Sequence, residues 1–398
     1  MTNSINTIRL SSQIRLNYIE KLILWLFTFS CILVEISANS LYYVLPNMEI
    51  YASLVSVTTL LLFGGKLIER ANRGIVLAFV IACFFFFLYV TLSQSDVPFI
   101  TKIYYVLFAA GFLSLKFCYR QKVYDWFVKI LAVLFFLGII EFSLTLIGIN
   151  FFWGMYERGG VLFNQGVFMS VPSYVGLQSV RFMAFCDEPG NVGTLSFFVL
   201  ATMNRLKYTK EYIVFLVSGL LSFSLAFYSL YAILLFFRIS NPIKLLKFIV
   251  PSMMILFVLY IPFGQYFEDE IISRVESKNS IGELDNRNSE TANKVFEEFI
   301  NSPQVLLGVG ERTYYNWKKQ SGNYSVGLKE HLLMYGIVGV SFLFLCFSIM
   351  LLKYNGYNKK TYILLLFYWI SFYQRSYWFF PPLVVLLFNQ SNKMDSPR

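Results

Sequence analysis

The sequence predicts an all-α fold: a polytopic bundle of about twelve transmembrane helices forming one integral membrane domain over residues 1–398. Three observations support this prediction. Of the 398 residues, 57% are hydrophobic and only 14% are charged. The mean hydropathy is +0.59, and a chain this apolar lies outside the usual composition of soluble domains. Apolar runs recur along the whole chain, so the classes of soluble enzymes are excluded.

Most apolar runs approach the roughly 20 residues that cross a bilayer as a helix. They fall near residues 22–45, 50–65, 75–93, 99–117, 127–152, 191–204, 212–238, 246–264, 331–352, 361–374 and 376–390. The first run is longer than the apolar core of a typical signal peptide and lacks a convincing cleavage site. We therefore interpret it as a span.

The run at 212–238 is long for one span and short for two. A single crossing would put Arg238, Lys244 and Lys247 outside, where every other short loop lacks Lys and Arg. Two short spans with a Ser-rich turn near 223–225 keep these charges inside. We therefore predict two spans.

The basic residues gather on one predicted side of the membrane. The cytoplasmic segments would be residues 1–21, 66–74, 116–129, 204–211, 238–247, 353–360 and 391–398. Together they hold 21 Lys and Arg against five acidic residues. This asymmetry places both termini in the cytoplasm. It also explains the net charge of +10 as a topology signal, so we exclude nucleic acid as a partner.

Two predicted external segments, residues 153–190 and 265–330, are much longer than the other connections. Loops longer than about 15 residues are uncommon unless they are functional or disordered. We therefore expect the functional residues in these two large loops. No Cys pair has metal-ligand spacing and no external Asp pair is clustered. A metal site and a cofactor are thus not predicted.

The first loop ends with Arg181 and the acidic pair Asp187-Glu188, followed by Pro189 and Gly190 before a span. Helix N-termini attract anions, and an adjacent arginine adds a bidentate phosphate ligand. One hypothesis is therefore an anion site at Arg181. The other is an interfacial ion pair of Arg181 with Glu188 that stabilises the loop.

The second loop contains Arg287, with Asn288 or Ser289 as a cap for a short helix. Val295, Phe296, Phe299 and Ile300 form one apolar face of this helix, which Asn301-Ser302-Pro303 ends. Gly308-Val309-Gly310 and Arg312 follow. No Rossmann pattern surrounds these glycines, so we expect them to turn the backbone at the membrane face.

His331 is the only histidine, and it follows Glu330 at the external start of a span. Imidazole titrates near neutrality and could move a proton, although a structural role for an interfacial histidine is the alternative.

Glu35, Glu141 and Arg375 lie at apolar depth. Such charges mark a site or a buried pair. Glu141 could orient an arginine, whereas Arg375 could simply reach the external surface.

These segments together resemble the bacterial O-antigen polymerase family (Wzy-type), within the superfamily shared with O-antigen ligases. The resemblance covers about residues 130–352. It rests on Gly138-Ile139-Ile140-Glu141, the segment from Arg181 to Gly193, the paired spans near 218–229, Arg287 with its short helix, Gly308-Val309-Gly310, and His331 to Gly339.

The resemblance implies a GT-C-type glycosyltransferase of the bacterial inner membrane, with its active site facing the periplasm. It would polymerise undecaprenyl-pyrophosphate-linked repeat units, using membrane lipid-linked glycans as donor and acceptor and acting without a metal. A chain-length regulator and a flippase would be further partners. Arg181, Arg287 and His331 match positions of the family pattern. Leu332 departs from it, because ligases carry Asn after the histidine.

For the chemistry, His331, Glu188 and Glu330 are the predicted catalytic residues, as proton acceptors for the acceptor hydroxyl. The predicted substrate-binding residues are Arg181, Arg287, Arg312, Arg375 and Glu141. Two alternative functions are an O-antigen ligase and a polysaccharide flippase or transporter. A membrane scaffold is disfavoured, because it would not need so many external arginines.

Overall fold

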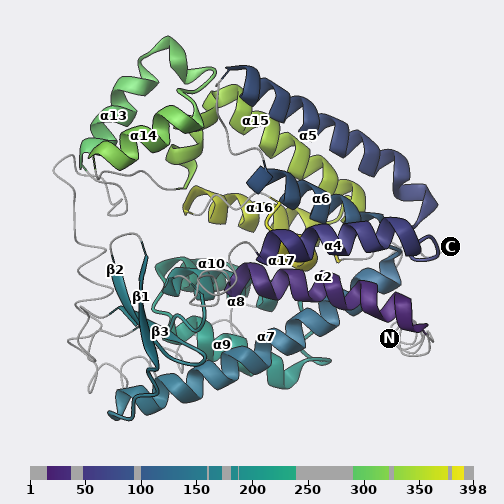
Figure 1. Cartoon of the computed structure of the whole chain (residues 1–398), viewed down its shortest axis with the longest axis vertical. Helices are drawn as coiled ribbons and strands as arrows, with labels where there is room; N and C mark the ends of the chain where they lie inside the picture. Colours follow the sequence, from purple (N-terminus) through teal and green to yellow (C-terminus); the bar gives the residue numbers. More distant parts are fainter. Residues whose placement is uncertain are drawn as a thin grey trace. The chain divides into compact units, whose positions relative to one another are not determined.

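The computed structural model describes residues 16–36, 48–93, 100–158, 161–172, 181–186, 188–238, 290–321, 327–374 and 379–389. These residues are mostly helical and contain 13 α-helices (Figure 1). They group into two compact units. Unit 1 comprises the described residues up to Ile130 and from Glu290 onward, and unit 2 comprises those from Leu131 to Arg238.

Unit 1 is built from helices. They are α2 (Tyr18–Ile36), α4 (Met48–Phe63), η1 (Arg70–Asn72), α5 (Arg73–Ser93), α6 (Ile100–Ser114), the first part of α7 (Phe117–Leu146), α13 (Glu290–Ile300), η4 (Pro303–Val305), α14 (Glu311–Ser321), α15 (Leu328–Asn355), α16 (Lys359–Gln374) and α17 (Pro381–Leu387). Of these, α2, α4, α5, α6, α15 and α16 begin within four residues of predicted apolar runs. The predicted helical class is thus confirmed for this unit.

Aromatic and small residues hold the helices of unit 1 together. Phe27 of α2 packs against Phe108 of α6, with ring centroids 5.3 Å apart. Ser30 and Ser56 share a hydrogen bond of 2.9 Å between α2 and α4. Phe347 of α15 stacks on Tyr368 of α16 at 3.7 Å. Apolar helices that pack through such contacts are typical of a helix bundle.

One end of unit 1 collects three segments that the charge pattern predicts to be cytoplasmic. Lys116 N–H donates to the carbonyl oxygen of Leu67 at 2.8 Å, which joins the 66–74 and 116–129 segments. Arg120 Nη1 donates to the Phe388 carbonyl at 2.9 Å. Asn355 Nδ2 donates to the neighbouring Leu387 carbonyl at 2.6 Å. The 353–360 segment therefore begins at the same end, where α15 finishes.

Unit 2 contains the rest of α7, the helices α8 (Pro189–Thr202), α9 (Thr209–Leu221) and α10 (Leu225–Arg238), and a sheet of β1 (Gly154–Arg158), β2 (Val161–Gln165) and β3 (Ser170–Pro172). The sheet is antiparallel in the order β1-β2-β3. Its register pairs Gly154 with Gln165, and Phe163 with Pro172. This sheet lies in the first large loop, and the all-α prediction did not include it.

The predicted break in the 212–238 run is confirmed as a break between two helices, α9 and α10. Ser222 to Ser224 connect them, and Phe223 has a positive φ of 47°. Arg238 Nη2 donates to the Leu200 carbonyl at 2.8 Å, so the end of α10 lies beside the end of α8. The break therefore lets the chain turn back within unit 2.

Among the described residues, α7 and α15 are long and apolar enough to cross a membrane, by length and composition. Four shorter apolar stretches are Ile50–Phe63, Arg73–Leu88, Ile103–Ser114 and Leu225–Arg238. Within the described part of the predicted run at 376–390, residues 379–389, the helix is the seven-residue α17, which is too short to cross a bilayer. The run at 246–264 lies outside the described residues. Twelve spans therefore stay a prediction.

Candidate functional site

The helix α15 is interrupted at Gly336, where φ is 66° and ψ is −177°. The backbone groups around this break pair with the loop that precedes α14. Val309 N–H donates to the Leu333 carbonyl at 2.8 Å, and Gly310 N–H donates to the Met334 carbonyl at 3.2 Å. On the far side of the break, Val338 N–H donates to the Leu306 carbonyl at 3.1 Å. Residues 306–310 thus hold the broken turn in place.

Only glycine fits at two positions of this contact. A Cβ atom on Gly308 would lie 2.4 Å from the Met334 carbonyl oxygen, and one on Gly336 would lie 2.3 Å from the Leu306 carbonyl oxygen. Gly308 and Gly310 also have positive φ values of 84° and 99°. The prediction that these glycines turn the backbone is confirmed, and their second role is to let two backbones touch.

A buried carboxylate stands directly after this loop. Glu311 is the first residue of α14 and is only 1% exposed, as is Tyr335 of α15. The Tyr335 phenol donates a hydrogen bond to Oε1 of Glu311. A buried carboxylate needs such a donor because burial removes its water, and the N-terminus of α14 favours its negative charge. Glu311 was not among the predicted site residues, because its partner Tyr335 lies on another helix.

His331 lies one helical turn before Tyr335 on the same face of α15. Its ring centroid is 5.5 Å from that of Tyr335, in an edge-on arrangement at 73°. Phe372 of α16 contacts the imidazole in the same way, also at 5.5 Å. His331 is 6% exposed. The structure therefore brings together Glu311, Tyr335 and His331, which we call the buried polar cluster.

Glu330 and Arg312 lie around this cluster in unit 1. Desolvation of the Tyr315 hydroxyl in α14, together with the nearby negative charge of Glu330, raises the pKa of Tyr315 to about 12, although the side chain is 45% exposed. Glu330 is half-buried, and Arg312 is exposed in the first turn of α14. Since consecutive helical residues point about 100° apart, Glu330 and His331 serve different faces of α15. Arg287 and Arg375 lie outside the described residues.

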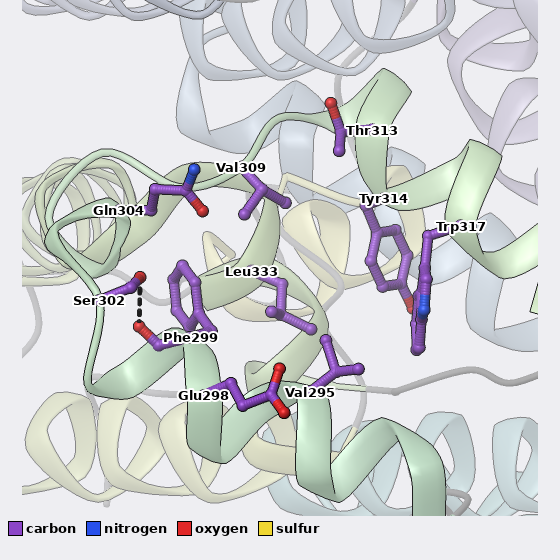
Figure 2. Close-up of a pocket in the computed structure, with 10 residues that line it drawn as sticks. All are labelled: Val295, Glu298, Phe299, Ser302, Gln304, Val309, Thr313, Tyr314, Trp317 and Leu333. Atoms are coloured by element: carbon purple, nitrogen blue, oxygen red, sulfur yellow. Dashed lines mark hydrogen bonds between the residues drawn. The ribbon is translucent and has the colours of Figure 1, made fainter.

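A cavity of about 370 Å³ opens between α13, η4, α14 and the start of α15. Figure 2 shows its ten lining residues, which are Val295, Glu298, Phe299, Ser302, Gln304, Val309, Thr313, Tyr314, Trp317 and Leu333. The apolar face predicted for the 291–300 helix contributes Val295 and Phe299. Ile300 is half exposed instead. Asn301 to Pro303 end the helix as predicted.

In unit 2, Arg181 binds the turn between α9 and α10. Its Nε and Nη2 donate to the Ser222 carbonyl at 3.2 and 3.0 Å, and Nη2 also donates to the Phe223 carbonyl at 2.8 Å. The guanidinium thereby caps the C-terminal end of α9, where carbonyl groups lack helical partners. The Nε and Nη2 atoms of Arg181 thus have a structural role at this turn.

The N-terminus of α8 packs at the same turn. A Cβ atom on Gly193 would lie 2.6 Å from Cβ of Ser224, so glycine is required for this close approach. Glu188 occupies the N-cap position of α8 and is exposed, and its side chain makes no capping hydrogen bond. The predicted turn at Pro189 into this helix is confirmed.

Glu141 of α7 is 4% exposed and binds backbone amides in unit 2. Its Oε1 accepts from Val167 N–H at 2.8 Å, and its Oε2 accepts from Phe168 N–H at 2.6 Å. A Cβ atom on Gly166 would lie 2.1 Å from Oε1. Glu141 therefore fixes the connection between β2 and β3, and its predicted part in substrate binding stays a prediction.

No family model, curated protein or solved structure matches the chain. In unit 1, a carboxylate, a phenol and an imidazole meet at a broken helix, and a cavity lies between the same helices. The carboxylate binds the phenol, and the phenol ring packs against the imidazole, which as a residue type can accept and return a proton. No group of three or more His, Cys, Asp or Glu that could hold a metal occurs among the described residues.

Proposed function

We propose that the protein is an integral membrane glycosyltransferase of the O-antigen polymerase type. It joins undecaprenyl-pyrophosphate-linked repeat units into O-antigen or a related surface polysaccharide at the periplasmic face of the bacterial inner membrane. The observation that carries this proposal is the buried polar cluster at the interrupted start of α15, beneath a short helical segment with its own cavity.

The orientation of α15 supports a periplasmic position for this site. The Asn355 end of α15 lies with the segments that hold Lys66, Lys116 and Lys353. The uninterrupted part of α15 after Gly336, residues 337–355, rises about 28 Å, close to the roughly 30 Å of the hydrocarbon core. The Leu328 end of α15, next to α13 and α14 (Figure 1), would then face the opposite side.

The exposed side chains of the helices support a membrane environment. Leu61, which is 72% exposed, is followed by the exposed Leu62 and Phe63 at the end of α4. Phe84 and Phe85 are exposed on α5. In water such contiguous apolar surface would favour aggregation, whereas lipid chains cover it at no such penalty. The two span-length helices α7 and α15 agree with this environment.

The proposed reaction transfers the growing glycan from its pyrophosphate to a hydroxyl of the incoming repeat unit. The bond between the anomeric carbon and the phosphate oxygen breaks, and a new bond forms to the acceptor oxygen. The acceptor loses a proton, and the lipid pyrophosphate leaves with the negative charge. Two functional groups are thus required: a proton acceptor and a cation that stabilises the leaving group.

We assign the proton acceptor to His331, with Glu330 and Glu188 as the alternatives. Tyr335 packs against the imidazole, and Glu311 holds the Tyr335 phenol. Tyr335 thus links Glu311 to the imidazole, and a negative charge on Glu311 would favour the imidazolium that forms after proton transfer. We assign pyrophosphate binding to arginines, among them Arg181, whose Nε and Nη2 also bind the carbonyls of Ser222 and Phe223.

Deletion of the gene tests the proposal. The surface polysaccharide of the deletion strain is separated by gel electrophoresis and compared with that of a complemented strain. A ladder reduced to one attached repeat unit is expected for a polymerase. Loss of all attached repeat units would instead indicate a ligase or a flippase.

A polysaccharide flippase or transporter is the second candidate, and the break in α15 favours it. Discontinuous transmembrane helices often form substrate sites in transporters. Purified protein in vesicles separates the two functions. A flippase would move labelled lipid-linked repeat units across the bilayer, whereas the polymerase would lengthen them.

A further inference from the structure

We propose that the cavity between α13, η4, α14 and α15 is a saccharide-binding subsite that takes a neutral section of the glycan. This inference rests on the proposed function and names the part of the substrate that this cavity would hold. The cavity measures about 370 Å³, near the lower limit for ligand pockets in proteins. It therefore suits a short piece of glycan better than a polyprenyl chain.

Aromatic rings form one wall of the cavity. Tyr314 and Trp317 lie one turn apart on α14, with ring centroids 5.9 Å apart at an angle of 41°. Figure 2 shows these rings side by side. Tyr314 is buried, whereas Trp317 is half-buried and lines the cavity. A sugar ring has an apolar C–H face, and an indole at the edge of a cavity offers a flat surface for it.

Polar groups stand around the apolar floor. Val295, Phe299 and Leu333 lie between the aromatic wall and the side that holds Ser302 and Gln304 (Figure 2). The Ser302 hydroxyl donates to the Phe299 carbonyl at 2.8 Å, so it presents its oxygen as an acceptor. Gln304 supplies a donor and an acceptor.

Two more polar groups complete the rim. Glu298 and Thr313 are both exposed at the cavity. A carboxylate accepts hydrogen bonds from two adjacent hydroxyls, which saccharides present in pairs. An aromatic platform combined with acceptors and an amide suits a sugar, because a sugar is apolar on its faces and polar at its edges. An alkyl chain would make no use of these rim groups, which stay accessible to water.

The charge of the residues that line the cavity indicates whether the bound sugar is acidic or neutral. The ten residues that line the cavity include one carboxylate, Glu298, and no Lys, Arg or His. An acidic sugar or a phosphate would meet a like charge there, which disfavours binding. We therefore expect a neutral or N-acetylated section of the glycan, with the pyrophosphate held elsewhere.

The position of the cavity relates it to the buried polar cluster within unit 1. Glu311 and Trp317 belong to the same helix, and six helical residues rise about 9 Å. Leu333 of the cavity floor lies between His331 and Tyr335 in α15. A glycan bound at Trp317 would therefore extend over only a short distance to the cluster. Binding there would set which sugar reaches the reacting position.

The test measures glycan binding by the purified full-length protein in nanodiscs. The probe is the water-soluble repeat unit released by mild acid from the lipid-linked glycans of the source strain, titrated by calorimetry. Trp317→Ala and Glu298→Gln are each expected to weaken binding about 3- to 10-fold, as for one aromatic contact or one hydrogen bond. Trp317→Phe should retain most of the affinity, because it keeps an aromatic ring.

The matched control is Tyr357→Ala, which removes an exposed aromatic ring far along the chain after α15 and should leave the affinity unchanged. Glu298→Gln also serves if Trp317→Ala does not fold, since Glu298 is exposed. Inorganic phosphate should not compete with the probe. Absence of binding by the wild type, unchanged affinity in both cavity variants, or competition by phosphate would each overturn the subsite.

The outcome for the subsite is separable from that for the proposed function. Polymer length in the complemented deletion strain reports the function independently of binding. If the complemented strain makes polymer but the affinity for the repeat unit is the same in the Trp317 and Glu298 variants as in the wild type, only the proposed subsite is wrong. If the deletion leaves the polymer unchanged, the polymerase function itself is wrong.

Discussion

The phenol of Tyr335 donates a hydrogen bond to the carboxylate of Glu311, although 24 positions separate the two residues in the chain. The contact joins the start of α14 to α15 one residue before the break at Gly336. It therefore fixes the helical segment around residues 290–321 to the helix that carries His331. A polar contact between two fully buried side chains depends strongly on both partners, because neither can turn to water.

This contact predicts that Glu311→Gln and Tyr335→Phe each lower polymer formation at least tenfold and lower the free energy of unfolding by about 1–3 kcal/mol. The double variant should lose less than the sum of the two, because both single changes remove the same hydrogen bond. The measurements are ladder length on gels and unfolding of the purified protein. Glu297→Gln, an exposed change on α13, is the matched control. Strictly additive losses would argue against the contact.

The fit of glycine at the interrupted turn leads to a second prediction. Gly336→Ala and Gly308→Ala should each destabilise the protein by about 1–3 kcal/mol or more, because a side chain is strained at positive φ and would meet a carbonyl oxygen. Gly74→Ala in α5 is the control, since nothing lies within 4 Å of a Cβ atom there. Thermal unfolding in detergent measures the effect. Equal melting temperatures for Gly336→Ala and Gly74→Ala would contradict this account of the break.

Most of the helical fold could be predicted, because an apolar run of sufficient length leaves the backbone few alternatives to a helix. The start of α4 and the break at Ser222–Ser224 follow from local composition and charge. The sheet was missed because its strands have only three to five residues and lie in a loop rich in Gly. The Gly-Gly sequence between the paired Arg158 and Val161 is typical of two-residue hairpin connections.

The candidate site could be predicted only in part, because its contacts join distant segments. His331 was found from its residue type and its place at the start of a span. Glu311 was not, since its partner Tyr335 lies on another helix. For Glu141, burial was predicted from its apolar surroundings, but its partners are backbone amides 26 and 27 residues away. Local spacing carries no signal for such pairs.

The two arginines that bind helix ends in unit 2 give a third prediction. Arg181 donates to the Ser222 and Phe223 carbonyls, and Arg238 donates in the same manner to Leu200 and Ala201. Lysine can replace only part of such a fork, so Arg181→Lys and Arg238→Lys should lower the free energy of unfolding by similar amounts of about 1–3 kcal/mol.

Activity then separates the two arginines. If Arg181 also binds pyrophosphate, Arg181→Lys should reduce polymer formation well beyond Arg238→Lys, by roughly 10²- to 10³-fold in rate. Polymer levels are compared at equal amounts of folded protein. Equal activity of the two lysine variants would restrict Arg181 to its role at the α9–α10 turn.

A fourth prediction concerns the side of the membrane on which each end of unit 1 lies. Asn301 follows α13 and is exposed, and Tyr357 follows α15 at its other end and is also exposed. In intact spheroplasts, an impermeant thiol reagent should label Asn301→Cys but label Tyr357→Cys only after the membrane is permeabilised. The parent protein with its five native cysteines sets the background. Labelling of both positions in intact cells would contradict the predicted topology.

The last prediction concerns His331 as the proton acceptor. His331→Ala should abolish the ladder when compared with the wild type at equal amounts of folded protein, a comparison that is needed because the variant also loses the edge-on ring contacts to Tyr335 and Phe372. His331→Gln should not restore activity, since a neutral amide can form hydrogen bonds but cannot take up a proton near neutral pH. Glu330→Gln, which changes the neighbouring face of α15, should retain polymer. If instead His331→Gln is fully active and Glu330→Gln is inactive, the imidazole only forms hydrogen bonds and the carboxylate of Glu330 is the base.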